Sequence, residues 1–514
     1  MKSFIRFFKW LFSRRMLKRY LCTAIVLVTL VALFYAVENY RGAKAWRKMR
    51  AELNADGISL DIADSLAPPV PDQENFCAIP LLRDLPLVID GDTEAGESGA
   101  KRRRLREVTI FYEAEDGPRP PRSGRLGDKT DLAAWRRYFE QTGLLPVPDT
   151  GNAAADIIEG MKVHQPVFDE LTSAIDRKHA LLVPRLEERL RGVSPLVSLS
   201  VPHYAPLQSL ASTLKLRAIA AARNADGQTA VDSLRIICRL AEATGNDSIL
   251  LGWLVESTFV AVMERGVWEL LNERTANPEQ LLALESQLSR IPLRESLLNA
   301  LKLELIMSSD YLELAKSTSL TKLADLPADM VPSEEILPRL YPDGWWDQNK
   351  VTGARLIRQQ VLLPISSGEF EQILLARNDS QQQSSGPYSF MSPAVEGPWR
   401  GLSLRLISQE CLLLQMGTAC ALERFYIANG SYPENLDALM PDFLSEVPVD
   451  PVDRKPMRYH RTEDGRYVIY SVGYDQRDDN GRPHPKGKKE PDIDRHTGIA
   501  DPTGYDWVWR YSFE

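Results

Sequence analysis

The sequence predicts a mainly α-helical protein with an N-terminal transmembrane helix, an irregular, short solenoid-like helical domain, and a C-terminal α+β domain. Three observations support this class. Residues 20–37 are apolar and uncharged, residues 131–307 carry apolar side chains at helical spacing, and the C-terminal part combines one long helical pattern with short alternating strands. With 514 residues, of which 44% are hydrophobic and 26% charged, the chain is long enough for two or three domains, each with a hydrophobic core.

The apolar stretch at residues 20–37 is predicted to cross a membrane. At a rise of about 1.5 Å per residue it spans roughly 27 Å, close to the thickness of a bilayer's hydrocarbon core. Residues 1–19 contain basic and no acidic side chains, so the positive-inside rule predicts a cytoplasmic N-terminus and an exported remainder. A cleaved signal peptide is the alternative, but the apolar run is too long and lacks small residues at a cleavage position. We therefore expect an uncleaved anchor. The basic residues are Lys2, Arg6, Lys9, Arg14, Arg15, Lys18 and Arg19.

Charge and cysteine content limit the partners. The net charge is −8, and the exported part is more acidic still, which argues against nucleic acid as a partner. The five cysteines show neither a CxxC motif nor metal-ligand spacing. The sequence does not decide whether a disulfide forms outside the membrane. Cys411 and Cys420 would lie on opposite faces of one helix and would not pair with each other. The others are Cys22, Cys77 and Cys238.

Residues 38–130 are expected to form a membrane-proximal region. Residues 38–53 continue as a polar helix with an apolar trace and are predicted to stand as a stalk. The proline-rich residues 67–82 should be extended. The basic run at residues 101–106 is interpreted as a solvated loop, with lipid headgroups as the alternative contact, and residues 107–112 as a short strand. The apolar trace consists of Ala43, Trp46, Met49 and Leu53.

Residues 131–400 are predicted to be an exported helical domain. Two of its helices surround a short turn and resemble a tetratricopeptide-type hairpin, but no second copy follows at that repeat's period of about 34 residues. Residues 310–398 are less regular, with a helical stretch near residues 349–363 and a polar loop at residues 378–387. The predicted helices are residues 131–141, 153–161, 167–182, 206–223, 227–243, 248–271, 278–289 and 293–307.

An aromatic patch interrupts the irregular part of this domain. Tyr341, Trp345 and Trp346 lie within the sequence YPDGWW. Such residues bind glycans or peptides when exposed, but aromatic side chains that close a helical domain more often belong to its core. We expect the core role.

Residues 401–514 are predicted to form the C-terminal α+β domain. Residues 402–427 form the strongest helix in the chain, and Asn429 and Gly430 supply a C-terminal stop. Strands are predicted at residues 457–461, 467–472 and 506–511, so that one helix precedes a small antiparallel sheet.

Three segments of this domain resemble the globular domain of the major, G-type pseudopilins of type II secretion systems. They are ALERFYIANGSYPENLDAL at residues 421–439, VPVDPVDRKPMRY at residues 447–459 and YSVGYDQRDDNG at residues 470–481. The resemblance implies a bacterial inner-membrane protein that works with envelope or secretion-related proteins. The family's processing site is absent here, and a long region separates the span from this domain. Assembly into a filament by the family's route is therefore not expected.

The resemblance also implies a calcium ion in the C-terminal loop. The matching loop is rich in carboxylates, which are the hard oxygen ligands that calcium prefers, although its spacing is not that of an EF-hand. A solvated acidic loop without metal is the alternative. The implied ligands are Asp475, Asp478, Asp479, Asp492, Asp494 and Asp506.

Sequence signatures of catalysis are absent. The chain has no GxSxG, HExxH, GxxxxGK[ST] or GxGxxG motif, and its six histidines are scattered. His203 has prolines on both sides, but a structural role is favoured. The sequence thus predicts a non-enzymatic membrane protein that scaffolds or docks onto envelope proteins. The alternatives are an exported hydrolase built around His203 or YPDGWW, and a calcium-dependent adhesion module. A buried cluster of histidine and carboxylates in a cleft would favour the hydrolase, and an exposed apolar groove would favour binding.

Overall fold

The computed structural model describes a series of α-helices and a C-terminal sheet. Contacts divide the chain into two compact units. Unit 1 comprises Met1–Ser59, Met307–Arg358 and Gln382–Gly397, and unit 2 comprises Leu60–Ile306, Gln359–Gln381 and Pro398–Glu514. The described residues are 14–66, 68–83, 104, 108, 118–121, 128–182, 201, 203–317, 341–368, 388–389, 399–474, 476–482 and 505–511.

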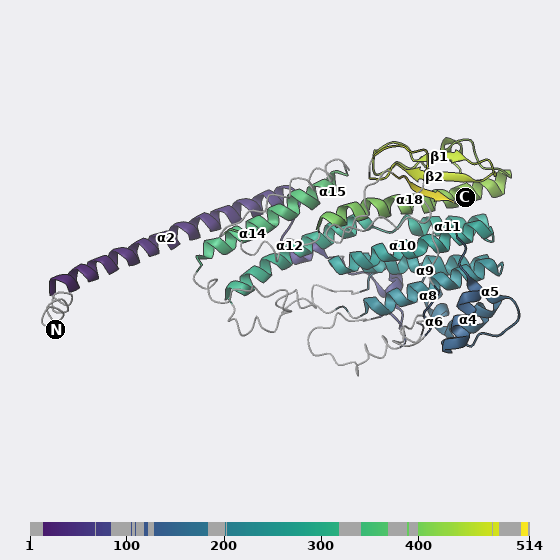
Figure 1. Cartoon of the computed structure of the whole chain (residues 1–514), viewed down its shortest axis with the longest axis horizontal. Helices are drawn as coiled ribbons and strands as arrows, with labels where there is room; N and C mark the ends of the chain where they lie inside the picture. The colour runs from purple at the N-terminus through teal and green to yellow at the C-terminus, as the bar shows by residue number, and fades with distance from the viewer. Residues whose placement is uncertain are drawn as a thin grey trace, which may run out of the picture. The chain divides into compact units, whose positions relative to one another are not determined.

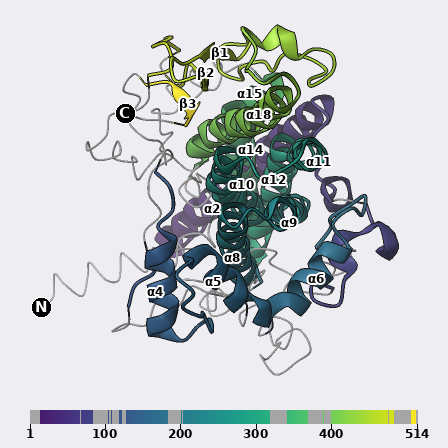
Figure 2. The ribbon, with the colours of Figure 1, turned by 90° about the vertical axis from the view of Figure 1, so that its right-hand side faces the viewer.

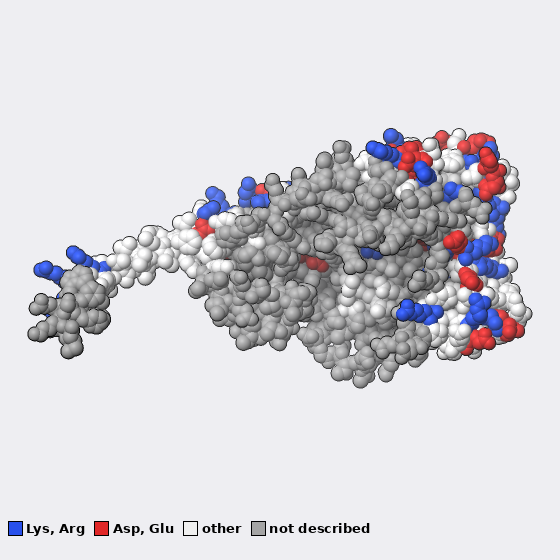
Figure 3. All heavy atoms as spheres, viewed as in Figure 1, with Lys and Arg blue, Asp and Glu red and all other residues white. Residues whose placement is uncertain are grey.

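Unit 1 is built on one long helix, α2 (Arg14–Ala55). This helix is long and apolar enough to cross a membrane, with a mean hydropathy of 2.4 over its most apolar window, which confirms that part of the prediction. Figure 1 shows α2 extending alone over its first half and lying along α14 (Asp343–Ile357) over its second. In Figure 3 the lone part is an uncharged rod with basic side chains at both ends.

The sequence suggested that the second half of α2 stands alone as a stalk. Instead, this half packs along α14. Its apolar trace is buried at Met49 and Leu53, which are 2% and 0% exposed. Nearer the apolar half, the backbones of Gly42 and Gly344 touch: a Cβ on Gly42 would lie 2.2 Å from the Gly344 carbonyl oxygen. Only glycines allow two helices to approach so closely. α14 also begins earlier than predicted, because Pro342 precedes its first turn and places the aromatic patch at the helix start.

Unit 2 contains most of the remaining helices. Those of the α8–α9–α10 group pack against one another, as Figure 2 shows, and α18 packs on both α10 and α11. The α-helices are α4 (Leu132–Thr142), α5 (Ala153–Met161), α6 (Gln165–Ser173), α8 (Tyr204–Arg223), α9 (Gly227–Gly245), α10 (Leu250–Glu273), α11 (Pro278–Leu288), α15 (Leu363–Ser367) and α18 (Trp399–Asn429), and α12 (Leu293–Ser317) is shared with unit 1. A π-helical turn, Arg358–Leu362, precedes α15, and short 3₁₀ turns are Ile62–Ser65, Asp72–Glu74, Phe76–Ala78, Lys162–His164 and Leu436–Leu439.

Helix starts follow ordinary capping chemistry. The Asp131 carboxylate accepts a hydrogen bond from the Ala134 amide at the start of α4, and Asp226 accepts one from Thr229 at the start of α9. Between α8 and α9 the chain turns at Ala225, whose φ is 60°. The predicted hairpin is therefore confirmed as a pair of antiparallel helices.

The predicted helix at residues 167–182 is too long, since α6 ends at Ser173. Backbone carbonyl groups after Ser173 accept hydrogen bonds from side chains of other segments and not from amides of a continued helix. The fully buried Arg239 guanidinium donates to the carbonyl of Arg177, at 2.8 Å, and to that of His179. Asn75 donates to the Leu181 carbonyl at 2.9 Å. These tertiary hydrogen bonds override the local helical pattern.

The C-terminal sheet is antiparallel, as predicted. Strands β1 (Arg458–Arg461), β2 (Tyr467–Ser471) and β3 (Trp507–Arg510) pair antiparallel in the order β1-β2-β3. All of β2 is buried, and α18 packs on β2 and β3. Figure 2 shows the sheet over α18. Both the predicted helical domain and the predicted C-terminal domain contribute to unit 2, and all five cysteines are free thiols. Apart from Val108, the predicted strand at residues 107–112 lies outside the described residues.

Candidate functional site

An open groove with a volume of about 700 Å³ lies in unit 2. Its sides are α11, the first turn of α12, the middle of α18 and the segment of residues 444–454. Most of its wall is apolar. The apolar residues are Leu288, Ile291, Pro292, Leu293, Leu413, Leu414, Leu444, Pro448, Val449 and Pro451.

Gly417 opens the middle of the groove. It lies within α18, and no described atom is within 4 Å of the position that a Cβ would take. Val449, on the opposite wall, is 43% exposed. A mid-helix glycine costs about 0.5–1 kcal/mol relative to alanine, so its place here is not explained by helix stability. The groove thus presents an accessible apolar surface with a gap in its helical wall.

Three of the six charged groups that line the groove, Glu285, Arg294 and Glu410, are held by partners within the protein. Arg294 donates to Glu410 through two nitrogens, one at 2.9 Å, and to the Ile365 carbonyl at 2.7 Å. Burial raises the pKa of Glu410, and the Arg294 guanidinium opposes that rise. Arg424 donates to Glu285 at 2.6 Å. Such bidentate and charge-assisted contacts fix side-chain positions, so this part of the rim is preorganised.

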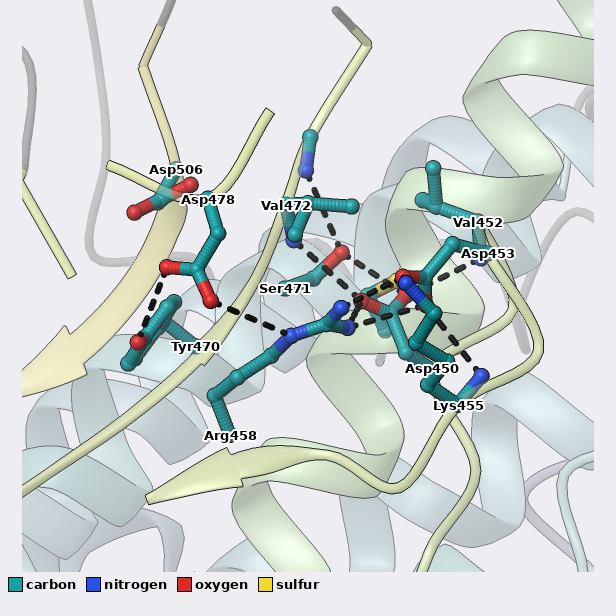
Figure 4. A network of polar contacts seen from close by, with 12 residues as sticks. Asp450, Val452, Asp453, Lys455, Arg458, Tyr470, Ser471, Val472, Asp478 and Asp506 are labelled. Carbon is teal, nitrogen blue, oxygen red and sulfur yellow. Dashed lines mark hydrogen bonds and ion pairs between the residues drawn. The ribbon is translucent and has the colours of Figure 1, made fainter. Parts of the chain in front are cut away.

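A buried carboxylate holds one wall of the groove in place. Asp450 is fully buried and accepts hydrogen bonds from the amides of Val452 (2.9 Å) and Val472 (3.2 Å). It also accepts from the Ser471 hydroxyl at 2.9 Å and from Arg458 at 2.8 Å. In Figure 4 Arg458 reaches from β1 toward Asp450 on one side and Asp478 on the other. The wall segment is therefore tied to β2, and the groove does not depend on a flexible loop.

The predicted calcium ligands are only partly described. Asp506 accepts hydrogen bonds from the amides of Asp479, at 3.1 Å, and Gly481, at 2.7 Å. Asp478 accepts one from the Tyr470 hydroxyl at 3.0 Å (Figure 4). Among the described residues, no three His, Cys, Asp or Glu side chains are grouped to hold a metal. Asp475, Asp492 and Asp494 lie outside the described residues, and calcium stays a prediction.

His203 lies in a buried polar cluster. It is 0% exposed, and its Nε2 is 4.0 Å from a carboxylate oxygen of Asp247, which accepts a hydrogen bond from the Tyr204 hydroxyl at 2.9 Å. Neither ring nitrogen of His203 has a hydrogen-bond partner among the described residues. Nearby, burial raises the pKa of Glu256 to about 8, while its contact with the Ser296 hydroxyl opposes the rise. The structure thus brings His203 to a carboxylate, but within the helical core.

Part of the aromatic patch belongs to the core, while Tyr341 and Trp345 are only half-buried. Trp346 is 4% exposed, and the half-buried Trp345 donates from its indole nitrogen to Glu38 at 3.0 Å. Tyr341 stacks beside Trp345, with ring centroids 5.0 Å apart. The expected packing role is therefore confirmed for Trp346.

Comparison of the chain with protein-family models, with curated proteins and with solved structures gave no significant match. The candidate site therefore depends on geometry alone. Sequence reasoning missed Arg294, which lies on α12, and Glu410 and Gly417, which both lie on α18. The one local signal was the glycine in the middle of an otherwise strong helix, since such a residue usually has a packing or functional reason.

Proposed function

We propose that this chain is a membrane-anchored, extracytoplasmic protein that binds another envelope protein through the groove between α11 and α18. The observation that carries the proposal is an open, preorganised apolar surface in a folded unit, which is a common form of protein-binding site. The groove is of a size that accepts a few side chains of a helix or an extended peptide. The pseudopilin resemblance supports a partner in a secretion-related assembly.

The charges around the groove indicate the chemistry of the partner. Four carboxylates line it against two guanidinium groups. An apolar segment with flanking lysine or arginine residues complements that balance, because opposite charges at a rim steer association and exclude wrong partners. The carboxylates are Glu285, Glu295, Glu410 and Glu446, and the guanidinium groups are those of Arg294 and Arg454.

Photo-crosslinking in cells tests this function. A benzophenone amino acid replaces Val449 in the groove or, as a matched control, Leu282 on α11, which is 51% exposed and does not line the groove. We expect an adduct from position 449 only, and its loss when Gly417→Leu fills the groove. Mass spectrometry should identify an apolar segment with basic flanks in the partner. Equal adducts from both positions, or none from position 449, would refute the proposal.

The membrane topology is part of the same proposal. Seven basic residues precede the apolar stretch, whereas five follow it within the next fifteen residues, which favours a cytoplasmic N-terminus. A membrane-impermeant maleimide tests this in a Cys22→Ala background. A cysteine replacing Lys44 should react in spheroplasts, and one replacing Lys18 only after lysis. The reverse pattern would invert the topology.

The hydrolase alternative depends on one observation, the proximity of buried His203 to Asp247. A histidine held by a carboxylate is the basis of many hydrolytic sites. Purified protein would be tested on ester, peptide and glycoside substrates, with His203→Ala as the comparison. Activity that His203→Ala removes without unfolding the protein would favour the enzyme over the docking protein.

A further inference from the structure

The start of α14 and the α2 segment beside it form a compact group of aromatic and charged side chains in unit 1. The Trp345 ring packs edge-on against Phe34, with centroids 6.1 Å apart, and its indole nitrogen donates to Glu38 at 3.0 Å. The centroid of the Tyr388 ring lies 6.5 Å from that of Trp345, and the centroid of the Tyr341 ring lies 5.0 Å from it. We call Phe34, Tyr341, Trp345 and Tyr388 the aromatic collar.

The position of the collar along α2 is set by sequence. Phe34 lies within the uncharged stretch at residues 20–37, and Glu38 is the first charged residue after it. The two are one helical turn apart, about 6 Å along the axis. Trp345 touches both, so the collar lies at the level where the uncharged stretch ends.

Glu38 fixes this level. Its carboxylate is 7% exposed and accepts hydrogen bonds from Tyr388 (2.7 Å), Trp345 (3.0 Å) and Arg41 (2.8 Å). The Tyr388 hydrogen bond is the largest of the contributions that lower the pKa of Glu38, so the group is held ionised. An ionised carboxylate with its partners does not move into hydrocarbon without a large cost. If α2 spans a bilayer, Glu38 therefore holds it in one register.

The collar keeps part of its surface exposed. Phe34 is 47% exposed, and Tyr341 and Trp345 are half-buried. Amphipathic Trp and Tyr rings are enriched where hydrocarbon gives way to headgroups, because one end of the ring is apolar and the other forms hydrogen bonds. The last turn of α12 reaches the same level, since Lys316 lies 3.3 Å from Asp343.

From this geometry we propose that the aromatic collar lies in the interfacial layer of the bilayer, where Tyr341 and Trp345 contact lipid and make the start of α14 a second membrane contact beside α2. This inference depends on the proposed membrane span. It assigns a lipid-facing role to residues far from the span in sequence, and it predicts that unit 1 is seated on the membrane surface.

Nitroxide labelling of the full chain in liposomes of phosphatidylcholine with some phosphatidylglycerol tests the depth. In the Cys22→Ala background, labels are placed singly at Val28 in the span, at Asp343 beside the collar and at Ala51, about 20 Å beyond Glu38 along α2. Accessibility to oxygen and to a nickel chelate reports depth. We expect bilayer values at Val28, aqueous values at Ala51, and a nickel accessibility at Asp343 several-fold below that at Ala51.

The outcomes separate the two proposals. If Val28 reads as bilayer but Asp343 matches Ala51, the collar proposal is wrong and the anchor stands. If Val28 reads as water, the anchor and the collar proposal fail together. If the label at position 343 has the same low nickel accessibility in aqueous protein without lipid or detergent, protein and not lipid shields it. That result also overturns the collar proposal.

Tryptophan quenching by lipids brominated near the headgroup gives an independent readout. Trp345→Phe should reduce the quenchable fraction of the fluorescence. Trp346→Phe is the matched control, because Trp346 is only 4% exposed and should not contact lipid. Circular dichroism confirms that both variants fold. An equal effect of the two substitutions, or no effect of Trp345→Phe, would contradict the proposal.

Discussion

A single methyl group at Gly344 should separate α2 from α14. A Cβ there would lie 1.9 Å from the Glu38 carbonyl oxygen and 2.8 Å from the Asn39 Cα, which are backbone atoms that a rotamer change does not move. Ordinary contact begins near 3.4 Å, so the helices must move apart by about 1.5 Å. That movement breaks the hydrogen bond from the Gly344 amide to the Asn39 side chain and strains that from Trp345 to Glu38.

The magnitude follows from these terms. Overpacking costs about 1–3 kcal/mol, and the two hydrogen bonds contribute about 1 kcal/mol each. The higher helix propensity of alanine relative to glycine offsets up to about 1 kcal/mol of this loss. Gly344→Ala should therefore weaken the α2–α14 contact by about 2–4 kcal/mol.

Hydrogen exchange of the α14 amides in full-length protein is the suitable assay, because a protein with two units need not unfold in one step. The expected loss corresponds to exchange about 30- to 700-fold faster at 1.4 kcal/mol per factor of ten. Gly417→Ala is the matched control, since no described atom is within 4 Å of its Cβ position. It should stabilise α18 by about 0.5–1 kcal/mol. Unchanged α14 exchange in Gly344→Ala would refute the close packing. Slower α14 exchange would show that the substitution stabilises the α2–α14 contact, which is the opposite of the expected effect.

Three further predictions concern unit 2. Asp450→Ala leaves two buried amides and part of Arg458 without an acceptor, so urea unfolding should show a loss of about 3 kcal/mol, and an unchanged midpoint would contradict the wall's dependence on Asp450. Glu256 keeps its proton to about pH 8 in the folded protein but loses it near its ordinary value when unfolded, so stability should fall as pH rises between these values, by at most about 1.4 kcal/mol per pH unit. Glu256→Gln should flatten that slope, and an identical slope would exclude Glu256 as its source. If the loop containing Asp478 and Asp506 binds calcium, thermal unfolding should shift upward with calcium relative to chelator, by about 2.7 kcal/mol at one hundred times the dissociation constant; the absence of a shift would leave the loop as solvated surface.

Local patterns predicted most of the secondary structure. The α8–α9 hairpin, the long α18 and the three strands follow from periodicity, capping residues and turns that neighbouring positions determine. The prediction for α6 was too long because Arg239, far along the chain, takes the carbonyl groups that a longer helix would have used. Local propensity could not foresee that donor.

The candidate sites could not be predicted in the same way. The Gly344 amide and its acceptor on Asn39 are 305 positions apart, and Arg294 and Glu410 are 116 apart. No local pattern in the sequence connects positions that are so far apart. The aromatic patch was recognised from its composition, but its role depends on Glu38, whose place at the end of the apolar stretch gains meaning only once α14 lies beside it.

Gly417 gives the sharpest distinction between a docking protein and a protein whose groove is only a packing defect. A packing defect would gain stability from a larger side chain at no functional cost, whereas a docking groove would gain stability and lose its partner. Gly417→Leu should therefore raise the unfolding midpoint of unit 2 and abolish the adduct from position 449. Gly417→Ala, which adds one methyl group, should raise the midpoint and reduce the adduct only in part. If Gly417→Leu is stabilised and the adduct persists, the partner binds elsewhere, and the groove has no part in docking.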